Sequence, residues 1–238
     1  MKLFINTGGK GERLYPLTLE IPKPMVKICS KPILHHLIDW AKINSIEEVV
    51  LMNGYKAEKI MEYFGDGSQF GIKITHSTEP YPLGSGGPIK YAKKHIDRRF
   101  AYIPGDLICD ADLKKMENFH DSKNSQITVL VHKSSHPHDS DILEIEKDFR
   151  VKKFVSKHED HSGCGNLSNA GLCIIEPEIL DVMEEEVFNF ENYLFPKIIK
   201  KNLRFFAYLT DEFIIDIGTM ERLRFCEEYL RSRTHFQD

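Results

Sequence analysis

Residues 3–18 read LFINTGGKGERLYPLT, in which a short apolar run passes directly into a glycine-rich loop. The run at 3–5 predicts a β-strand. Glycines at positions 8, 9 and 11 permit a tight turn that presents backbone N–H groups to an anion. In an open α/β sheet such a loop lies at the carboxyl end of a strand, where ligands bind. The spacing is neither G-x-G-x-x-G nor a Walker A loop, which disfavours a dinucleotide-binding start.

Short apolar runs alternate with amphipathic segments through the first 130 or so residues. The periodicity predicts further strands at 49–52, 72–74 and 100–103. It predicts helices at 33–41, 57–64 and 88–95, the last with proline at the helix start, where its missing N–H has no cost. Strand–helix alternation of this kind indicates βαβ units with a mostly parallel sheet.

The second half of the chain has a different pattern. Four strand-like runs follow one another without helices between them, at 127–131, 142–145, 151–155 and 171–175. From residue 177 the chain predicts two helices, two strands and a terminal helix from Thr219. At about 150 residues per domain, 238 residues predict one α/β domain spanning 1–238. We expect a Rossmann-like, mostly parallel central sheet flanked by helices, with an antiparallel elaboration in the second half.

Composition excludes several partners. The chain is 41% hydrophobic and 29% charged with a net charge of −4, so it has no broad electrostatic footprint for nucleic acid or an anionic membrane. No apolar run approaches the roughly 18 residues of a membrane span, and the N-terminal run is too short for a signal-peptide core. Five scattered cysteines without a Cys-x-x-Cys pair are typical of a reduced, cytoplasmic protein. We expect neither a nucleic-acid nor a membrane partner; homo-oligomerisation stays open.

Two cations follow the glycine-rich loop. Arg13 lies two residues past the last glycine, and Lys23 lies between Pro22 and Pro24. A lysine between two prolines has a stiffly placed backbone and cannot join a helix. In isolation Lys23 is typical of a solvated loop cation. Beside a glycine-rich loop and Arg13, polyphosphate binding is the favoured interpretation.

The pattern Gly-Gly-x-Gly-x-Arg-Leu-x-Pro-x-Thr followed by Pro-Lys-Pro resembles the signature of the sugar-1-phosphate nucleotidyltransferases. It stands here as residues 8–18 and 22–24, and Asn6-Thr7 replaces the small apolar pair usual before the glycines. The resemblance spans residues 1 to about 225 and implies the nucleotide-diphospho-sugar transferase fold. It implies a nucleotide-binding half at 1–125 and a sugar-phosphate-binding half at 126–238. It also implies that the triphosphate is held by Gly8, Gly9, Gly11, Arg13 and Lys23, the last two acting in catalysis.

The run Pro82-Leu83-Gly84-Ser85-Gly86-Gly87 resembles the second nucleotide-binding loop of that family. The resemblance implies that Gly84, Ser85 and Gly86 approach the base and ribose. The preceding Glu79 offers a carboxylate that accepts two adjacent N–H bonds. Guanine presents such a pair at N1 and N2, whereas uracil and thymine present one ring N–H. This favours GTP, and the context of Glu79 is similar to the mannose-1-phosphate guanylyltransferase branch; a solvent-exposed Glu79 is the alternative.

Two aspartates stand where the family carries metal ligands. Asp106 follows the strand predicted at 100–103, and Asp216 opens Asp-Ile-Gly-Thr, although Met220 replaces a common proline. The resemblance implies that both hold Mg²⁺, a hard cation that prefers carboxylate oxygens and substrate phosphates. The alternative is that Asp216 or Thr219 caps the terminal helix.

The resemblance assigns Lys157 to the phosphate of the acceptor sugar and Asn169 to the sugar hydroxyls. The family's glutamate before this lysine is Ser156 here, which indicates a different sugar. The stretch after Pro137 resembles nucleotidyltransferases of heptose-phosphate pathways, which contribute to lipopolysaccharide or capsule. This favours D-glycero-D-manno-heptose 1-phosphate over mannose 1-phosphate, with Asp139 or Asp141 meeting extra hydroxyls; an Asp/Pro turn is the alternative.

These features together predict a Mg²⁺-dependent enzyme that joins a nucleoside triphosphate to a sugar 1-phosphate and releases pyrophosphate. GTP is the favoured nucleoside triphosphate. The alternatives are uridylyl or thymidylyl transfer to a hexose 1-phosphate and a non-catalytic nucleotide-sensing subunit. A glycosyltransferase using Asp110-x-Asp112 is disfavoured, because that pair reads better as a helix cap. Structural zinc is also disfavoured, and its candidate ligands are His132, His136, His138, His158, His161 and Cys164.

Overall fold

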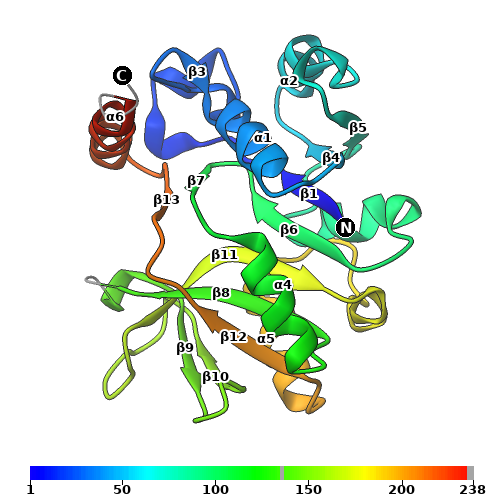
Figure 1. Cartoon of the computed structure of the whole chain (residues 1–238), viewed down its shortest axis with the longest axis vertical. Helices are drawn as coiled ribbons and strands as arrows, with labels where there is room; N and C mark the ends of the chain where they lie inside the picture. Colours follow the sequence, from blue (N-terminus) through cyan, green and yellow to red (C-terminus); the bar gives the residue numbers. More distant parts are fainter. Residues whose placement is uncertain (135–136, 235–238) are drawn as a thin grey trace. The chain divides into compact units, whose positions relative to one another are not determined.

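The computed structural model describes residues 1–134 and 137–234 (Figure 1). Its contacts group into two compact units, each built from separate stretches of chain. The glycine-loop unit comprises residues 2–82, 103–111 and 212 onward; the antiparallel unit comprises Met1, 83–102 and 112–211. The assignment of nucleotide binding to residues 1–125 and of sugar-phosphate binding to residues 126–238 stays a prediction. The compact units are interleaved along the chain instead, because residues 103–111 and 212 onward pack with the first 82.

The glycine-loop unit contains the parallel part of the fold. Strands β1 (Lys2–Asn6), β4 (Glu48–Asn53) and β5 (Lys73–Thr78) lie in the order β1-β4-β5, and both pairings are parallel. The apolar run of β1 is fully buried. The last residues of β6 (Phe100–Pro104) continue this sheet beside β1. The parallel βαβ arrangement predicted from the first half is therefore confirmed.

Helices and short segments complete this unit. Helix α1 (Ile33–Ile43) buries the apolar positions that predicted it, and Trp40 Nε1 donates to the carbonyl of Ala111 at 2.9 Å. Helix α2 (Ala57–Phe64) packs against β5. Between β1 and α1 the chain forms three 3₁₀ turns, η1 (Glu12–Leu14), η2 (Leu17–Leu19) and η3 (Lys23–Met25), and the hairpin of β2 (Lys27–Ile28) and β3 (Lys31–Pro32).

A small antiparallel pair closes the glycine-loop unit. Strand β7 (Leu107–Cys109) pairs with β13 (Ile214–Asp216), and the pairing places Asp216 opposite Leu107. Helix α6 (Met220–Thr234), red in Figure 1, follows β13 and contacts β13 and β2. The apolar cluster beneath these elements comprises Leu14, Val26, Ile28, Ile33, Ile108, Ile217, Leu223 and Cys226.

The antiparallel unit is built on a second group of strands. Strand β11 (Leu167–Ile175) pairs antiparallel with β8 (Ile127–Lys133), β9 (Ile142–Ile145) and the first residues of β6. Strand β10 (Val151–Val155) pairs antiparallel with β9, and β12 (Phe205–Leu209) pairs parallel with β8. The predicted antiparallel elaboration is confirmed.

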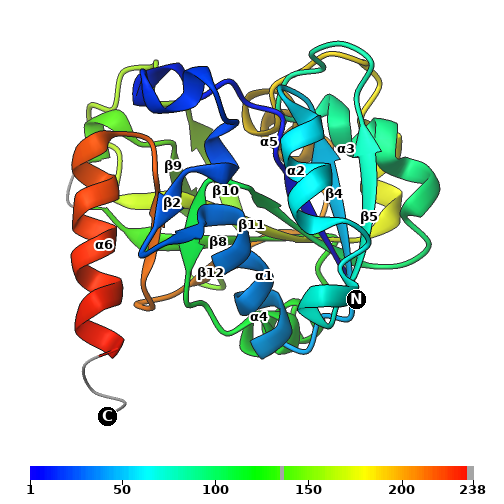
Figure 2. The ribbon, with the colours of Figure 1, turned by 90° about the horizontal axis from the view of Figure 1, so that it is seen from above.

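Two helices cover this second group of strands. Helix α4 (Leu113–Ser122) packs against β8, β11 and β12, and α5 (Phe190–Lys200) packs against β10. Figures 1 and 2 show α4 and α5 on opposite faces of the strands. The helix predicted at 88–95 is α3 (Gly87–Tyr91) followed by the 3₁₀ turn η5 (Ala92–His95).

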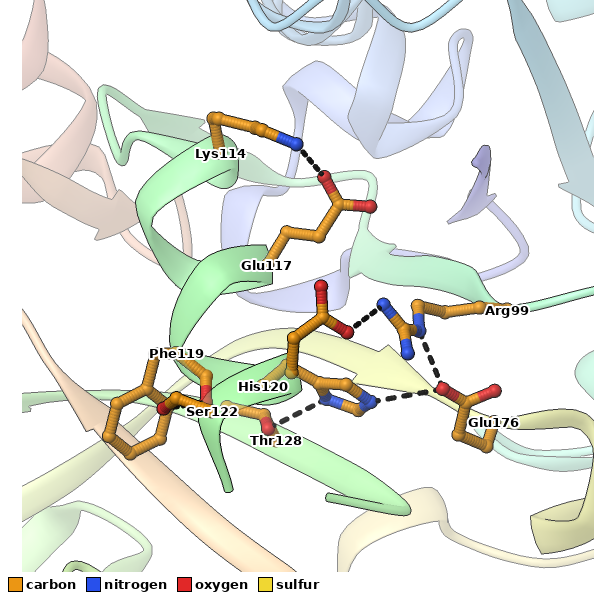
Figure 3. Close-up of polar contacts among 9 residues, drawn as sticks. Arg99, Lys114, Glu117, Phe119, His120, Ser122, Thr128 and Glu176 are labelled. Atoms are coloured by element: carbon orange, nitrogen blue, oxygen red, sulfur yellow. Dashed lines mark hydrogen bonds and ion pairs between the residues drawn. The ribbon is translucent and has the colours of Figure 1, made fainter. Parts of the chain in front are cut away.

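A polar cluster fixes α4 to the sheet (Figure 3). His120 on α4 is fully buried, and its Nδ1 and Nε2 lie 2.8 Å from Thr128 Oγ1 and 3.3 Å from Glu176 Oε1. Arg99 donates to Glu176 and to Asp121, each at 2.6 Å. Burial and the Arg99 cation lower the pKa of His120, which favours the neutral form of the imidazole.

Of the helices in the described residues, none combines the length and the apolar character needed to cross a membrane.

Candidate functional site

The glycine-loop unit contains a cavity of about 400 Å³. Its walls come from the loop after β1, from η3, from the turn before β7 and from the segment after β13. The cavity therefore brings together residues that are far apart in the sequence, including the predicted triphosphate loop and one predicted metal ligand. The lining residues are Gly9, Lys10, Gly11, Glu12, Arg13, Lys23, Asp106 and Gly218.

Local geometry explains one of the three glycines in the first loop. Gly11 has φ +68°, in the left-handed region, and an added Cβ would lie 2.8 Å from Lys23 Cβ. Its carbonyl accepts a hydrogen bond from Thr18 Oγ1 at 2.9 Å. Gly11 thus allows η3 to approach the loop and places the Lys23 side chain beside the cavity.

Asn6 and Thr7, the two residues that depart from the family pattern, both make hydrogen bonds within the glycine-loop unit. Its side-chain oxygen accepts the Gly8 N–H at 3.2 Å. The neighbouring Thr7 is buried, and its hydroxyl lies 2.9 Å from both the Met52 carbonyl and Asn53 Oδ1. In this conformation the Gly8 N–H is therefore engaged within the loop. The contact of Gly8 with a triphosphate stays a prediction. For the Gly8 N–H to donate to a phosphate, its hydrogen bond to Asn6 would have to break.

Lys23 is not a solvated loop cation. The residue is only 8% exposed, and its ammonium forms an ion pair with the carboxylate of Asp106. The φ of Pro24, restricted by its ring, and the 3₁₀ turn η3 fix the backbone from which Lys23 projects. The two residues that the sequence assigned to phosphate and to metal are thus direct neighbours.

Strand pairing places the two predicted metal ligands on adjacent segments. Asp216 lies opposite Leu107, the residue after Asp106, and the Ile217 N–H donates to the Asp106 carbonyl at 2.8 Å. No group of three or more potential ligands occurs within residues 1–134 and 137–234. Two carboxylates that leave further positions to substrate phosphates are a donor set that suits Mg²⁺. The residues present fit this ion.

Sequence reasoning did not identify Arg222. Its guanidinium forms an ion pair with the carboxylate of Asp216. The Arg222 N–H donates to Thr219 Oγ1 at 3.3 Å, so Thr219 caps the first turn of α6 and Asp216 does not. A cation six positions after a candidate metal ligand, in the first turn of the predicted helix, was the available signal.

The guanidinium of Arg13 lies against the backbone of Gly218. A Cβ at Gly218 would be 2.5 Å from Asp216 Oδ1 and 3.0 Å from Arg13 Nη2. Glycine at this position therefore keeps the Asp216 carboxylate and the Arg13 cation close to each other.

Glu79 lies beside the first glycine loop. An added Cβ at Gly8 would lie 3.1 Å from Glu79 Oε1, and one at Gly54 would overlap the same oxygen. The Glu79 N–H donates to the Asn53 carbonyl at 2.9 Å, which fixes the residue just after β5. This carboxylate thus borders the loop predicted to bind the triphosphate, and its role toward guanine stays a prediction.

The second glycine loop belongs to the antiparallel unit, where Phe188 accounts for its composition. A Cβ at Gly84 would overlap the Phe188 carbonyl, and one at Gly86 would overlap its ring. The Ser85 hydroxyl accepts the Phe190 N–H at 2.8 Å. These contacts require small residues whether or not a nucleotide is bound, so the predicted nucleotide contacts of Gly84, Ser85 and Gly86 stay predictions.

Asp141 joins the two residues assigned to the sugar. Its Oδ1 accepts the Lys157 N–H at 2.8 Å, and its carbonyl accepts the Asn169 N–H at 2.9 Å. The side chain of Lys157 is exposed. Asn169 uses its own side-chain oxygen to accept the Gly171 N–H at 3.0 Å. The Ser156 N–H donates to Glu159 Oε2 at 2.8 Å, so a carboxylate that the sequence did not identify stabilises the backbone before Lys157.

The rival assignments gain no support. His161 is buried and its Nε2 lies 2.9 Å from the Ser156 carbonyl, whereas His136 lies outside the described residues. Asp112 caps α4 by accepting the Lys115 N–H at 3.0 Å. Asp110 instead accepts a hydrogen bond from Tyr229 at 2.7 Å and pairs with Arg233. Asp112 therefore caps the first turn of α4, and Asp110 contacts the C-terminal part of α6.

Comparison with known proteins identifies the relatives of this chain. Residues 3–232 match the family model described as nucleotidyl transferase. Mannose-1-phosphate guanylyltransferase 1 from Arabidopsis thaliana is 36% identical over 224 residues, which cover 92% of this chain and 61% of the relative. The chain therefore spans less than two thirds of the length of this curated relative.

Solved structures agree with this comparison. HddC from Yersinia pseudotuberculosis, solved alone and complexed with GMP-PN, is 30% identical with a TM-score of 0.83, covering 96% of this chain and 99% of that chain. A putative glucose-1-phosphate thymidylyltransferase from Bacillus anthracis has a TM-score of 0.86 at 18% identity, covering 97% of this chain and 95% of that chain. At that identity the second likeness shows a common fold alone.

Proposed function

Because the chain belongs to the nucleotidyl transferase family, we propose that it transfers a guanylyl group from GTP to a sugar 1-phosphate and releases pyrophosphate. The observation that carries this proposal is the cavity in which the first glycine loop meets Arg13, Lys23 and Asp106. Clustered cations beside a carboxylate suit a polyphosphate that arrives with a metal ion.

The chemistry requires alignment more than proton transfer. A phosphate oxygen of the sugar 1-phosphate is already an anion, so its attack on the α-phosphorus of GTP needs no general base. Pyrophosphate departs in line with the attacking oxygen. Catalysis then consists of positioning the two anions and neutralising the charge that develops on the phosphates.

Residues of the cavity supply this neutralisation. Arg13 and Lys23 would donate to phosphate oxygens of the nucleotide. Asp106 and Asp216 would hold Mg²⁺, which would supply positive charge at the α-phosphate when bound. In the antiparallel unit, Lys157 would bind the phosphate of the acceptor and reduce the repulsion between the two substrates.

Guanine is the proposed base and a manno-configured sugar the proposed acceptor. The Glu79 carboxylate beside Gly8 supports guanine, as does the GMP-PN complex of HddC. The likeness to mannose-1-phosphate guanylyltransferase 1 of Arabidopsis supports mannose 1-phosphate, while the stretch after Pro137 favours D-glycero-D-manno-heptose 1-phosphate. The heptose assignment would place the product in the synthesis of lipopolysaccharide or capsule, and the five scattered cysteines favour the cytoplasm as the location.

A pyrophosphate-release assay with Mg²⁺ tests the proposal. It crosses GTP, UTP, dTTP, CTP and ATP with heptose, mannose, glucose and N-acetylhexosamine 1-phosphates. Release with GTP and a manno-configured acceptor is the expected result, and kcat/KM then ranks heptose against mannose. Release only with UTP or dTTP and a hexose 1-phosphate would replace the guanylyl assignment. Nucleotide binding without any release would favour a nucleotide-sensing subunit.

A further inference from the structure

Each of the two carboxylates assigned to Mg²⁺ already has a cation of the protein bound to it. Lys23 pairs with Asp106, and Arg222 pairs with Asp216. The two pairs differ in exposure: the Lys23 side chain is 10% exposed, whereas the Arg222 and Asp216 side chains are both 39% exposed. Arg222 is therefore the cation that can leave its carboxylate at little cost in free energy, because both partners are already partly exposed to water.

We propose that Arg222 is a counter-cation that occupies Asp216 in the free protein and must leave it before a divalent cation binds there. This inference rests on the proposed function, because that function makes Asp216 a metal ligand. It assigns Arg222 a positioning role: the residue controls when the carboxylate is open to metal, and it contacts no reacting atom.

Both oxygens of the Asp216 carboxylate lie near a cation of the protein. Oδ2 is bound by the guanidinium of Arg222, and Oδ1 lies beside Gly218, next to Arg13. A metal ion approaching Oδ2 meets a positive group at the same oxygen and is repelled by it. Exchange of one cation for the other at Oδ2 is the arrangement that avoids this repulsion.

The anchoring of Arg222 suits such an exchange. Its backbone is fixed in the first turn of α6 by the hydrogen bond to Thr219. The long, half-exposed side chain can then swing into solvent without disturbing the helix. A surface ion pair of this kind contributes little to stability, so its loss opposes metal binding only weakly.

The consequence is that Arg222 lowers the affinity of the nucleotide-free protein for divalent cations by a modest factor. With Arg222 in place, Asp216 is neutralised and does not repel the anionic triphosphate. A metal ion that arrives bound to the nucleotide brings phosphate ligands with it and can displace the guanidinium. The ion and the nucleotide should thus be taken up together.

Mn²⁺ binding to the nucleotide-free chain of residues 1–238 tests the proposal. Calorimetric titration of Arg222→Gln is expected to show at least threefold tighter Mn²⁺ binding than the wild type. Arg224→Gln, which removes an exposed arginine two positions further along α6, is the matched control and is expected to bind Mn²⁺ like the wild type. Circular dichroism verifies that all variants are folded.

A double-mutant cycle locates the effect. In an Asp216→Asn background, Arg222→Gln should no longer tighten Mn²⁺ binding, because the carboxylate that Arg222 occupies is absent. Equal or weaker Mn²⁺ binding by Arg222→Gln in the wild-type background overturns the proposal. So does equal tightening by Arg224→Gln, or binding that stays undetectable in every variant.

Pyrophosphate release measured on the same samples separates this inference from the proposed function. Wild-type release combined with unchanged Mn²⁺ affinity in Arg222→Gln rejects the role of Arg222 and leaves guanylyl transfer intact. Tighter Mn²⁺ binding without release from any substrate pair supports the counter-cation and rejects the transferase assignment.

Discussion

Gly218 shows how closely the charged groups of the cavity are placed. Its missing side chain leaves the space that the Asp216 carboxylate and the Arg13 guanidinium share, and any side chain at this position would push one of them away. The requirement comes from the neighbours and not from the backbone conformation of Gly218. A substitution there changes the position of two charges without removing either of them.

Gly218→Ala is therefore expected to lower kcat/KM about 100-fold, because displacement of a charged group by about 1 Å is sufficient for a loss of this size. Steady-state pyrophosphate release measures the loss. Gly165→Ala is the matched control, since no atom lies within 4 Å of the position of an added Cβ there. Activity of Gly218→Ala within threefold of the control would contradict the placement of Asp216 and Arg13.

Lys157 provides a second test at this scale. Its side chain is exposed and its backbone is held by Asp141, so Lys157→Ala should leave the loop in place. Loss of a charge-assisted bond to the acceptor phosphate should raise the KM for sugar 1-phosphate about 10- to 100-fold, with little change in the KM for GTP. Lys152→Ala, another exposed lysine in the same unit, is the control. An increase confined to the KM for GTP would refute the assignment.

Local and distant contacts differed in how well the sequence predicted them. Gly11 and Lys23 belong to a motif of adjacent positions, and the motif indicated a common role for them. The ion pair of Arg222 with Asp216 depends on where the first turn of α6 lies, which spacing alone does not fix. Likewise, Phe188 explains Gly84 and Gly86 through contacts about 100 positions away in the chain, beyond any local signal.

At the scale of elements, the pair of β7 and β13 has the largest effect on the site. The pair is short and antiparallel, and it aligns Asp106 and Asp216 although they are distant in sequence. Strand β13 was predicted from its apolar residues, but β7 was not. Each strand has three residues, too short a pattern to distinguish a strand by itself, and β13 was predicted because its apolar run leads into the Asp-Ile-Gly-Thr motif. Strands β1 and β4 were predicted from continuous apolar runs, and α1 was predicted from apolar residues at helical spacing.

The attachment of α4 to its sheet makes stability depend on pH. Burial and the Arg99 cation lower the pKa of His120 below its ordinary value of about 6.5. The unfolded chain therefore binds a proton at His120 at a pH where the folded chain does not. We expect the free energy of unfolding to be highest above pH 6.5 and to fall as the pH decreases from 6.5 toward the lowered pKa.

Urea unfolding at pH 7.5 and 5.5 measures this dependence. The loss of stability on acidification should be smaller in His120→Gln than in the wild type, because glutamine does not titrate. His138→Gln, at an exposed position, is the control and should retain the wild-type dependence. An identical loss in all three proteins would show that groups other than His120 determine it.

For the whole molecule, the two resident cations predict that metal is needed for activity and not for the fold. A chelator should reduce pyrophosphate release to below about 1%, and added Mg²⁺ should restore it. The melting temperature of the nucleotide-free protein should change by less than about 2 °C, because Lys23 and Arg222 already neutralise the two carboxylates. A large drop in melting temperature on chelation would instead indicate a structural metal.

The interleaving of the two units has a consequence for biosynthesis. A ribosome releases the chain from its N-terminus, so residues 112–211 of the antiparallel unit emerge before residue 212 and the segment that follows it. The glycine-loop unit receives β13, α6 and Asp216 only after the antiparallel unit has been translated. A nascent chain therefore displays the first glycine loop early, yet it has both carboxylates proposed to hold Mg²⁺ only after residues 112–211 have been made.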